Sequence, residues 1–291
     1  MNHNLTDLLA KLLLLIIVAT PARMEILSAQ ELSYRGGVNY STGSYFFTEN
    51  TGTFYINNGL SLQMNRLTLS ANIPYLVQNS PWISYSNMGG LPTGGTQSGE
   101  VRRAGMNGGM GGGGGRRQQI VLIDTTSYTQ SSFSDPSVYT GFRVYTSSNG
   151  KSVVMINGQL KIPVTNPSKG FGTGAWDSSL GVSVSQSIGM NWMFFGDVSH
   201  WWMGDMDDLK LNNTWAFGIG LGKMLSGGKW LINTNFNALT SILDDYDPPM
   251  NLSVGSGYRV NSNTLLNMTW SLGLSESSPD VSVGVGWSYK L

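Results

Sequence analysis

Cysteine is absent from the 291 residues of the chain, which excludes disulfide frameworks and thiolate metal sites. Charged residues are scarce, at 12% of the chain against about 25% in a typical soluble protein. The 17 basic and 17 acidic residues cancel, so the charge gives no sign of a nucleic-acid partner. Long apolar runs are also missing. The longest, residues 12–18, is too short to be a good membrane-spanning helix.

The N-terminus has the pattern of a secretory signal peptide. Lys11 precedes the apolar run 12–18, and small residues follow it. We expect residues 1–29 to form the signal peptide, with cleavage after Ala22 or after Ala29. An N-terminal membrane anchor is the alternative, and Asp7 weakens the signal-peptide prediction.

Residues 30–291 alternate apolar with small or polar residues in repeated runs. In the last run, 281–291, every odd position is apolar and every even position is small or polar. A period of two predicts a strand whose two faces differ. The runs lie at residues 32–41, 53–64, 67–77, 138–145, 152–163, 178–186, 190–200, 214–223, 230–239, 250–259, 265–274 and 281–291.

The connections between these runs are alternately short and long. This is expected of antiparallel strands that cross a membrane, with short periplasmic turns and long external loops. With twelve strands, both termini of the chain fall on the periplasmic side. The sequence therefore predicts an all-β fold, a transmembrane antiparallel β-barrel of about 12 strands over residues 30–291. Its location would be the outer membrane of a Gram-negative-type bacterium.

Aromatic residues often stand near the ends of the runs, as lipid-headgroup girdles require. A soluble sandwich with one buried face per strand is the alternative, but it needs no such girdles and would carry more surface charge. The outward aromatic and apolar positions include Tyr40, Phe54, Trp215, Trp230, Tyr258, Met268, Trp270 and Tyr289.

The opposite parity of the runs is rich in hydrogen-bonding side chains and should face the lumen. Such a wall can line water or fill itself with a side-chain network, because a twelve-strand cylinder is intermediate between filled and open barrels. Charged candidates for lumen contacts, with a slight cationic excess, are Arg35, Arg143, Lys161, Asp197 and Arg259.

The second long loop, residues 78–137, is predicted to be extracellular and contains the Gly-rich tract 106–117. This composition cannot bury a core. Two interpretations remain open: a disordered surface loop, or a mobile gate whose four arginines attract anions such as lipopolysaccharide phosphates. The apolar stretch 119–124 could add a short strand. The arginines are Arg102, Arg103, Arg116 and Arg117.

Short motifs resemble a known family. Two strands end in Ile-Pro, at residues 73–74 and 162–163, and the second is followed by a Gly-rich loop in which Gly172, Gly174 and Asp177 open the next strand. Ser134-Asp135 is similar to a Gly-Asp motif. This pattern, over about residues 53–291, resembles the outer-membrane "meta-pathway of phenol degradation" transporter-like family. The resemblance implies uptake or export of small, often hydrophobic or aromatic compounds, and it implies no catalytic residue.

Enzymatic chemistry is poorly supported. The outer-membrane phospholipase uses Ser, His and Asn, but adjacent strand residues such as Ser199 and His200 point to opposite faces. The segment 218–223 is similar to a phosphate-binding loop but fits the strand alternation better. The acidic segments 205–208 and 244–247 are interpreted as solvated loop tips. We therefore expect no enzyme, no cofactor and no metal.

The predicted function is an outer-membrane channel for the passive passage of small organic molecules, with hydrophobic or aromatic compounds as candidates. The second long loop is a candidate gate for this channel. The alternative is a sealed structural or interaction barrel that presents its loops or sheathes a partner protein. Expected partners are outer-membrane lipid, lipopolysaccharide and a small-molecule solute, with the chain acting as a monomer and with no nucleic acid.

Overall fold

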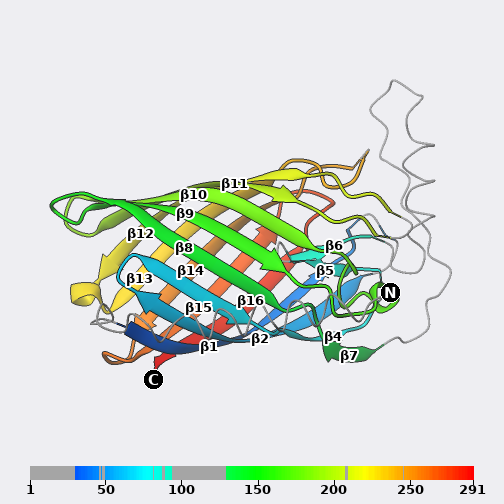
Figure 1. Ribbon diagram of the computed structural model, residues 1–291, viewed down its shortest axis with the longest axis horizontal. Helices are drawn as coiled ribbons and strands as arrows, with labels where there is room; N and C mark the ends of the chain where they lie inside the picture. Colours follow the sequence, from blue (N-terminus) through cyan, green and yellow to red (C-terminus); the bar gives the residue numbers. More distant parts are fainter. Residues whose placement is uncertain are drawn as a thin grey trace, which may run out of the picture.

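The computed structural model describes residues 30–45, 47, 50–80, 82–86, 89–93, 129–206, 209–244 and 246–291. Twelve strands close into one antiparallel barrel, as predicted (Figure 1). They are β1 (Gln30–Gly43), β2 (Thr51–Met64), β3 (Leu67–Asn72), β8 (Ser137–Thr146), β9 (Ser152–Lys161), β10 (Asp177–Ile188), β11 (Trp192–Trp202), β12 (Thr214–Leu225), β13 (Trp230–Leu239), β14 (Met250–Arg259), β15 (Thr264–Gly273) and β16 (Val281–Lys290).

The first strand closes the ring by pairing with strands from both ends of the barrel sequence. Ser33 of β1 is opposite Ser61 of β2 on one side and Lys290 of β16 on the other. Closure pairs the backbone groups at both edges of the sheet, which is the condition for a sheet to lie in hydrocarbon. The connections alternate as predicted, and Figure 1 shows the short turns gathered at one end of the barrel and the long loops at the other.

One predicted strand is broken, and a strand that was not predicted precedes another across a break. The strand predicted at 67–77 divides at Ile73-Pro74 into β3 and β4 (Tyr75–Gln78), and residues 134–136 separate β8 from a preceding strand, β7 (Gln130–Phe133). Proline has no N–H to give to the ladder, so Pro74 and Pro136 interrupt it. Beyond the breaks, β4 and β7 pair with each other and extend this part of the wall toward the long-loop end.

The outer face is apolar, as the alternation predicts. In β12, Trp215, Phe217, Ile219 and Leu221 are about half exposed, while Gly218 and Gly220 face inward. Rings gather on this face near both ends of the strands. At the long-loop end His200 lies between Trp202 and Trp215, with ring centroids 4.7 and 4.8 Å away. At the short-turn end Trp230 contacts Tyr258 at 4.5 Å. These are the expected girdles.

Inward-facing glycines keep the wall thin. A Cβ added to Gly218 would lie 2.3 Å from the Asp197 carboxylate, and one added to Gly220 would lie 2.1 Å from the Asn235 amide oxygen. The polar side chain of one strand therefore lies flat over the glycine of its neighbour instead of projecting into the lumen. This arrangement preserves free volume inside a barrel of twelve strands.

Several predicted features lie outside the described residues. They are the signal peptide at 1–29, the Gly-rich tract at 106–117 with its arginines, and the apolar stretch 119–124. The described part of the second long loop contains a hairpin that the alternation did not predict, formed by β5 (Ser84–Ser86) and β6 (Gly89–Leu91). Within the described ranges, no helix is long and apolar enough to cross a membrane.

Adjacent residues of β15 test the assignment of the two faces. Met268 faces outward near mid-strand, and Thr269 faces the lumen. We expect Met268→Lys to lower the free energy of unfolding by about 2–4 kcal/mol, because the ammonium would lie in hydrocarbon. Thr269→Lys places the ammonium in the water of the lumen, so it should change the free energy of unfolding by no more than about 0.5 kcal/mol. Urea unfolding in lipid vesicles, followed by heat-modifiable gel migration, measures both. Equal losses would contradict the face assignment.

Candidate functional site

The long loops fold together into an apolar cluster at one end of the barrel. We call it the loop-end cluster. Its side chains are at most 7% exposed and come from five of the six long connections together with the adjoining strand ends. Its members are Tyr45, Phe47, Leu76, Trp82, Ile83, Leu91, Phe171, Trp201, Met203, Met206, Leu209, Leu211, Ile242 and Leu243.

The β5–β6 hairpin contributes the part of this cluster that comes from the second long loop. Its base is closed by a 2.7 Å hydrogen bond between the hydroxyls of Ser84 and Thr93, both fully buried. Figure 1 shows β5 and β6 at the long-loop end, next to the strands that form the barrel mouth. The hairpin brings Leu91 against the loop-end cluster. Part of the second long loop is therefore folded structure and not an open surface loop.

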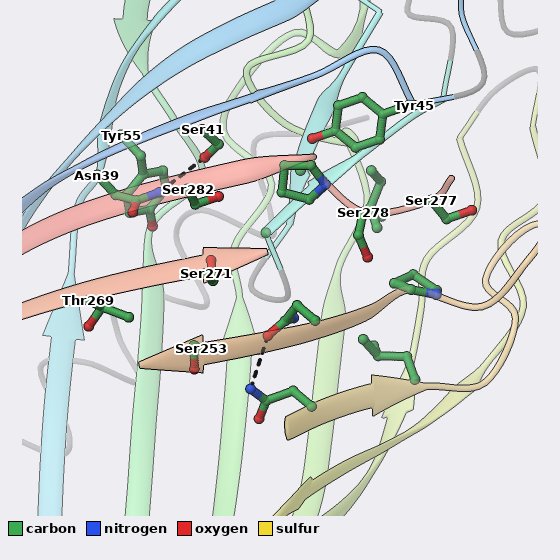
Figure 2. Close-up of a pocket in the computed structure, with 18 of the residues that line it drawn as sticks. Asn39, Ser41, Tyr45, Tyr55, Ser253, Thr269, Ser271, Ser277, Ser278 and Ser282 are labelled. Carbon is green, nitrogen blue, oxygen red and sulfur yellow. Dashed lines mark hydrogen bonds between the residues drawn. The ribbon is translucent and has the colours of Figure 1, made fainter. Parts of the chain in front are cut away.

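An upper cavity of about 510 Å³ lies beneath the loop-end cluster. Tyr45, Leu91 and Ile242 of the cluster line it on one side. Hydroxyl and amide side chains from the strands line the other side, and Figure 2 shows several of them around the open space. These strand residues are Asn39, Ser41, Asn237, Asn251, Ser253, Thr269, Ser271 and Ser282.

Two further cavities continue along the same wall toward the short-turn end. A middle cavity of about 680 Å³ shares Asn39, Tyr55 and Thr269 with the upper cavity. A lower cavity of about 350 Å³ shares Leu265 and Ser288 with the middle cavity. The three cavities follow β1, β15 and β16 from the underside of the loop-end cluster to the short-turn end.

The loop-end cluster has a narrow seam. A gap of about 10 Å³ lies between Leu91 and Pro92 of the hairpin side and Ile242, Leu243 and Pro249 of the β13–β14 connection. A volume of this size is at the lower limit for one water molecule. The walls are apolar apart from Ser277, so the seam as it stands is too narrow for a solute.

The five predicted lumen residues lie at different levels of the barrel. Arg35 lines the middle cavity, and Arg259 lines the lower one with Glu31 and Lys290. Asp197 faces the lumen over Gly218. Arg143 is half-buried beside the bulge in β8 near the short-turn end.

Lys161 has a different environment from the other four. Its side chain is 1% exposed and lies 2.8 Å from the Asp177 carboxylate and 3.6 Å from the Asp135 carboxylate. The ammonium also donates to the Thr173 hydroxyl. Two buried acids therefore neutralise this cation, at the end of β9 next to the long loops.

This ion cluster organises the loop that follows β9. Asp135 accepts hydrogen bonds from the N–H groups of Val164 and Thr165 at 2.9 and 3.0 Å. Asp177 accepts one from the N–H of Gly204 at 3.1 Å, which ties in the next long loop. Gly172 is required by close approach, because an added Cβ would lie 2.2 Å from Asp135.

Sequence reasoning missed this cluster because its members are separated in the chain. The sequence signal for this ion cluster was the set of short motifs that resemble the outer-membrane transporter-like family. Ser134-Asp135, the strand end before Pro163, and Gly172 to Asp177 were each noted separately, and the structure brings all three segments to Lys161. In the structure, the residues of these motifs hold the long loops together around Lys161.

The residues considered for catalysis are not arranged for it. Ser199 faces inward, where it accepts a hydrogen bond from the Trp201 indole at 3.1 Å, and His200 packs among the outward girdle rings. Across the described ranges, no group of three or more His, Cys, Asp or Glu could hold a metal ion.

Solved structures share this fold. An outer-membrane channel from Pseudomonas putida F1 superposes with a TM-score of 0.63 at 13% identity, covering 93% of this chain and 99% of that one. The NanC porin has a TM-score of 0.51 at 10% identity, covering 89% and 100%. No protein-family model and no curated protein sequence matches this chain. The closed barrel, its apolar outer face and this shared fold make the chain an outer-membrane β-barrel.

Removing the buried cation tests the role of the ion cluster. Lys161→Met should lower the free energy of unfolding by about 3–5 kcal/mol, because Asp135 and Asp177 would stay buried without a counter-charge. Lys290→Met is the matched control. It breaks an exposed 2.7 Å ion pair with Glu31, so the free energy of unfolding should fall by at most about 1 kcal/mol. Urea titration in lipid vesicles measures both variants.

A charge-neutral triple variant supplies the second control. Adding Asp135→Asn and Asp177→Asn to Lys161→Met removes the unpaired charges, so part of the lost stability should return. If Lys161→Met unfolds at the same urea concentration as Lys290→Met, the ion cluster does not hold the loops.

Proposed function

We propose that this barrel is a channel through which small organic molecules cross the outer membrane passively. The observation that carries the proposal is the run of three cavities along β1, β15 and β16, joined by shared lining residues. A barrel that fills its interior with side chains does not need inward-facing glycines, which leave space along its inner wall. Here Gly284 and Gly286 of β16 line the middle cavity.

In this proposal, the solute enters at the long-loop end and leaves at the short-turn end. It would pass between Leu91 of the hairpin and Ile242 of the β13–β14 connection, at the seam between these two segments. Separating two apolar surfaces exposes them to water, so the closed arrangement is favoured until a solute replaces the contact. The loop-end cluster would then act as the gate of the channel.

The solute class follows from the sequence resemblance and from the gate. We infer small, often hydrophobic or aromatic molecules, as the resemblance to the phenol-degradation transporter-like family implies. An apolar gate lowers the cost of entry for such a solute, because it replaces the buried contacts that it displaces. The proposal also retains a cleavable signal peptide at 1–29, a monomeric barrel, and lipopolysaccharide around the extracellular loops.

A sealed barrel is the second candidate, and the closed loop-end cluster favours it. With a volume of only about 10 Å³, the seam as it stands does not admit a solute. In this alternative, the loops would present a surface to a partner, and the cavities would hold only water.

Solute influx into liposomes separates the two candidates. Vesicles that contain the folded chain should swell in isotonic solutions of small neutral solutes faster than empty vesicles do. A panel of aromatic and aliphatic solutes would identify the preferred class. Swelling indistinguishable from that of empty vesicles, for every solute, would leave the sealed barrel as the better description.

The gate is tested by shortening the side chains on both sides of the seam. Leu91→Ala combined with Ile242→Ala should raise the influx rate several-fold, because the enlarged gap no longer excludes water. Val260→Ala is the control: it removes similar apolar atoms from an exposed position beside a short turn. Gel migration checks that both variants are folded. An influx rate that stays at the parent level would show that this seam is not the point of entry.

A further inference from the structure

We infer that the upper cavity is a selectivity filter for uncharged solutes that carry hydroxyl, amide or carbonyl groups on one side and an apolar face on the other. The inference rests on the proposed channel function and specifies its solute class. It starts from the absence of charge: of the described residues that line the upper cavity, none is acidic, basic or histidine.

Charge increases from one cavity to the next along the path. Arg35 is the only charged residue among the described lining of the middle cavity. The lower cavity, at the short-turn end, is lined by Glu31, Arg259 and Lys290. Lys161 and its two aspartates, at the end of β9 next to the long loops, are buried and paired with one another. The neutral stretch therefore lies directly behind the gate.

An ion that enters the upper cavity loses hydration without gaining a counter-charge. Burying an unpaired charge costs far more than burying a hydroxyl or an amide that finds a hydrogen bond. This penalty applies to cations and anions alike, because the cavity wall offers only neutral dipoles. The upper cavity should therefore exclude charge of both signs.

The same cavity can bind a neutral molecule on two sides. On the strand side, Asn39 donates to the Ser41 hydroxyl at 3.0 Å, as a dashed line in Figure 2 shows, and Asn237 donates to the Asn251 amide oxygen at 3.2 Å. These pairs orient the amides, and the hydroxyls of Thr269, Ser271 and Ser282 offer donors and acceptors beside them.

The loop side of the cavity is mainly apolar. It is formed by Tyr45, Leu91 and Ile242, with Leu239 at the end of β13 and with Ser277 and Ser278 of the β15–β16 connection. The Tyr55 ring lies on the strand side, where Tyr55 pairs with Asn39. A molecule with one apolar face can pack against the loop side while its polar groups replace water on the strand wall. A volume of about 510 Å³ falls in the range of small-molecule binding sites.

Thiol chemistry provides the test, because the chain has no cysteine of its own. Ser271→Cys places one thiol in the upper cavity, and Ser288→Cys places one at the junction of the middle and lower cavities. Each purified, folded variant is treated with three methanethiosulfonates: the neutral methyl, the cationic aminoethyl and the anionic sulfonatoethyl reagent. Rates are divided by those of a free thiol, which removes intrinsic reactivity.

The corrected ratio of neutral to charged rates should be at least about tenfold higher at Ser271→Cys than at Ser288→Cys, for both signs of charge. Adding Ser253→Asp to Ser271→Cys should restore the rate of reaction with the cationic reagent, while the reaction with the anionic reagent stays slow. Ser282→Asp serves the same purpose if the first variant does not fold. Equal ratios at the two cysteines, or restoration of both charged reagents by one aspartate, would overturn the filter.

Liposome influx separates failure of the filter from failure of the channel. Glucose, glucosamine and glucuronate have similar size and carry zero, positive and negative charge. Influx of glucose alone supports the filter. Equal influx of all three keeps the channel but removes the filter. Influx of none of them and of no solute in the aromatic and aliphatic panel, also in the Leu91→Ala, Ile242→Ala variant, removes the channel itself.

Discussion

The requirement that every backbone amide in hydrocarbon be hydrogen-bonded determines this architecture. A sheet with free edges could not lie in the membrane, so β1 pairs with β2 on one side and β16 on the other. Closure in turn creates an interior that the chain must fill, leave open or block. The glycines that lie under neighbouring polar side chains leave it partly open along the wall, and the described parts of the long loops pack into an apolar cluster at one end.

Electrostatics inside the barrel are controlled by position. Where a cation is fully buried, at Lys161, two carboxylates surround it and also bind loop N–H groups. Where charges face water, as at Arg259 and Lys290, they lie near the short-turn end. The described lining of the upper cavity uses hydroxyls and amides, which can hydrogen-bond without the desolvation penalty of an ion.

The strands and the loops have different roles in this barrel. The strands supply the membrane surface on one face and the polar wall on the other. The loops supply nearly all of the apolar core of the molecule, which in a membrane barrel cannot form between the strands because their apolar face meets lipid. A solute passing through this barrel would therefore meet an apolar surface first and a polar wall second.

The sequence alone determined the number of strands, their two faces, the aromatic girdles and the alternation of turns and loops. These follow from side-chain periodicity, which is local: each residue reports its face independently of distant partners. The sequence could not decide that Lys161 would be buried between Asp135 and Asp177, that β5 and β6 would enter the loop-end cluster, or that the upper cavity would lack charge. Each of these depends on which loops meet in space, and contacts between distant segments leave no periodic signal in the chain.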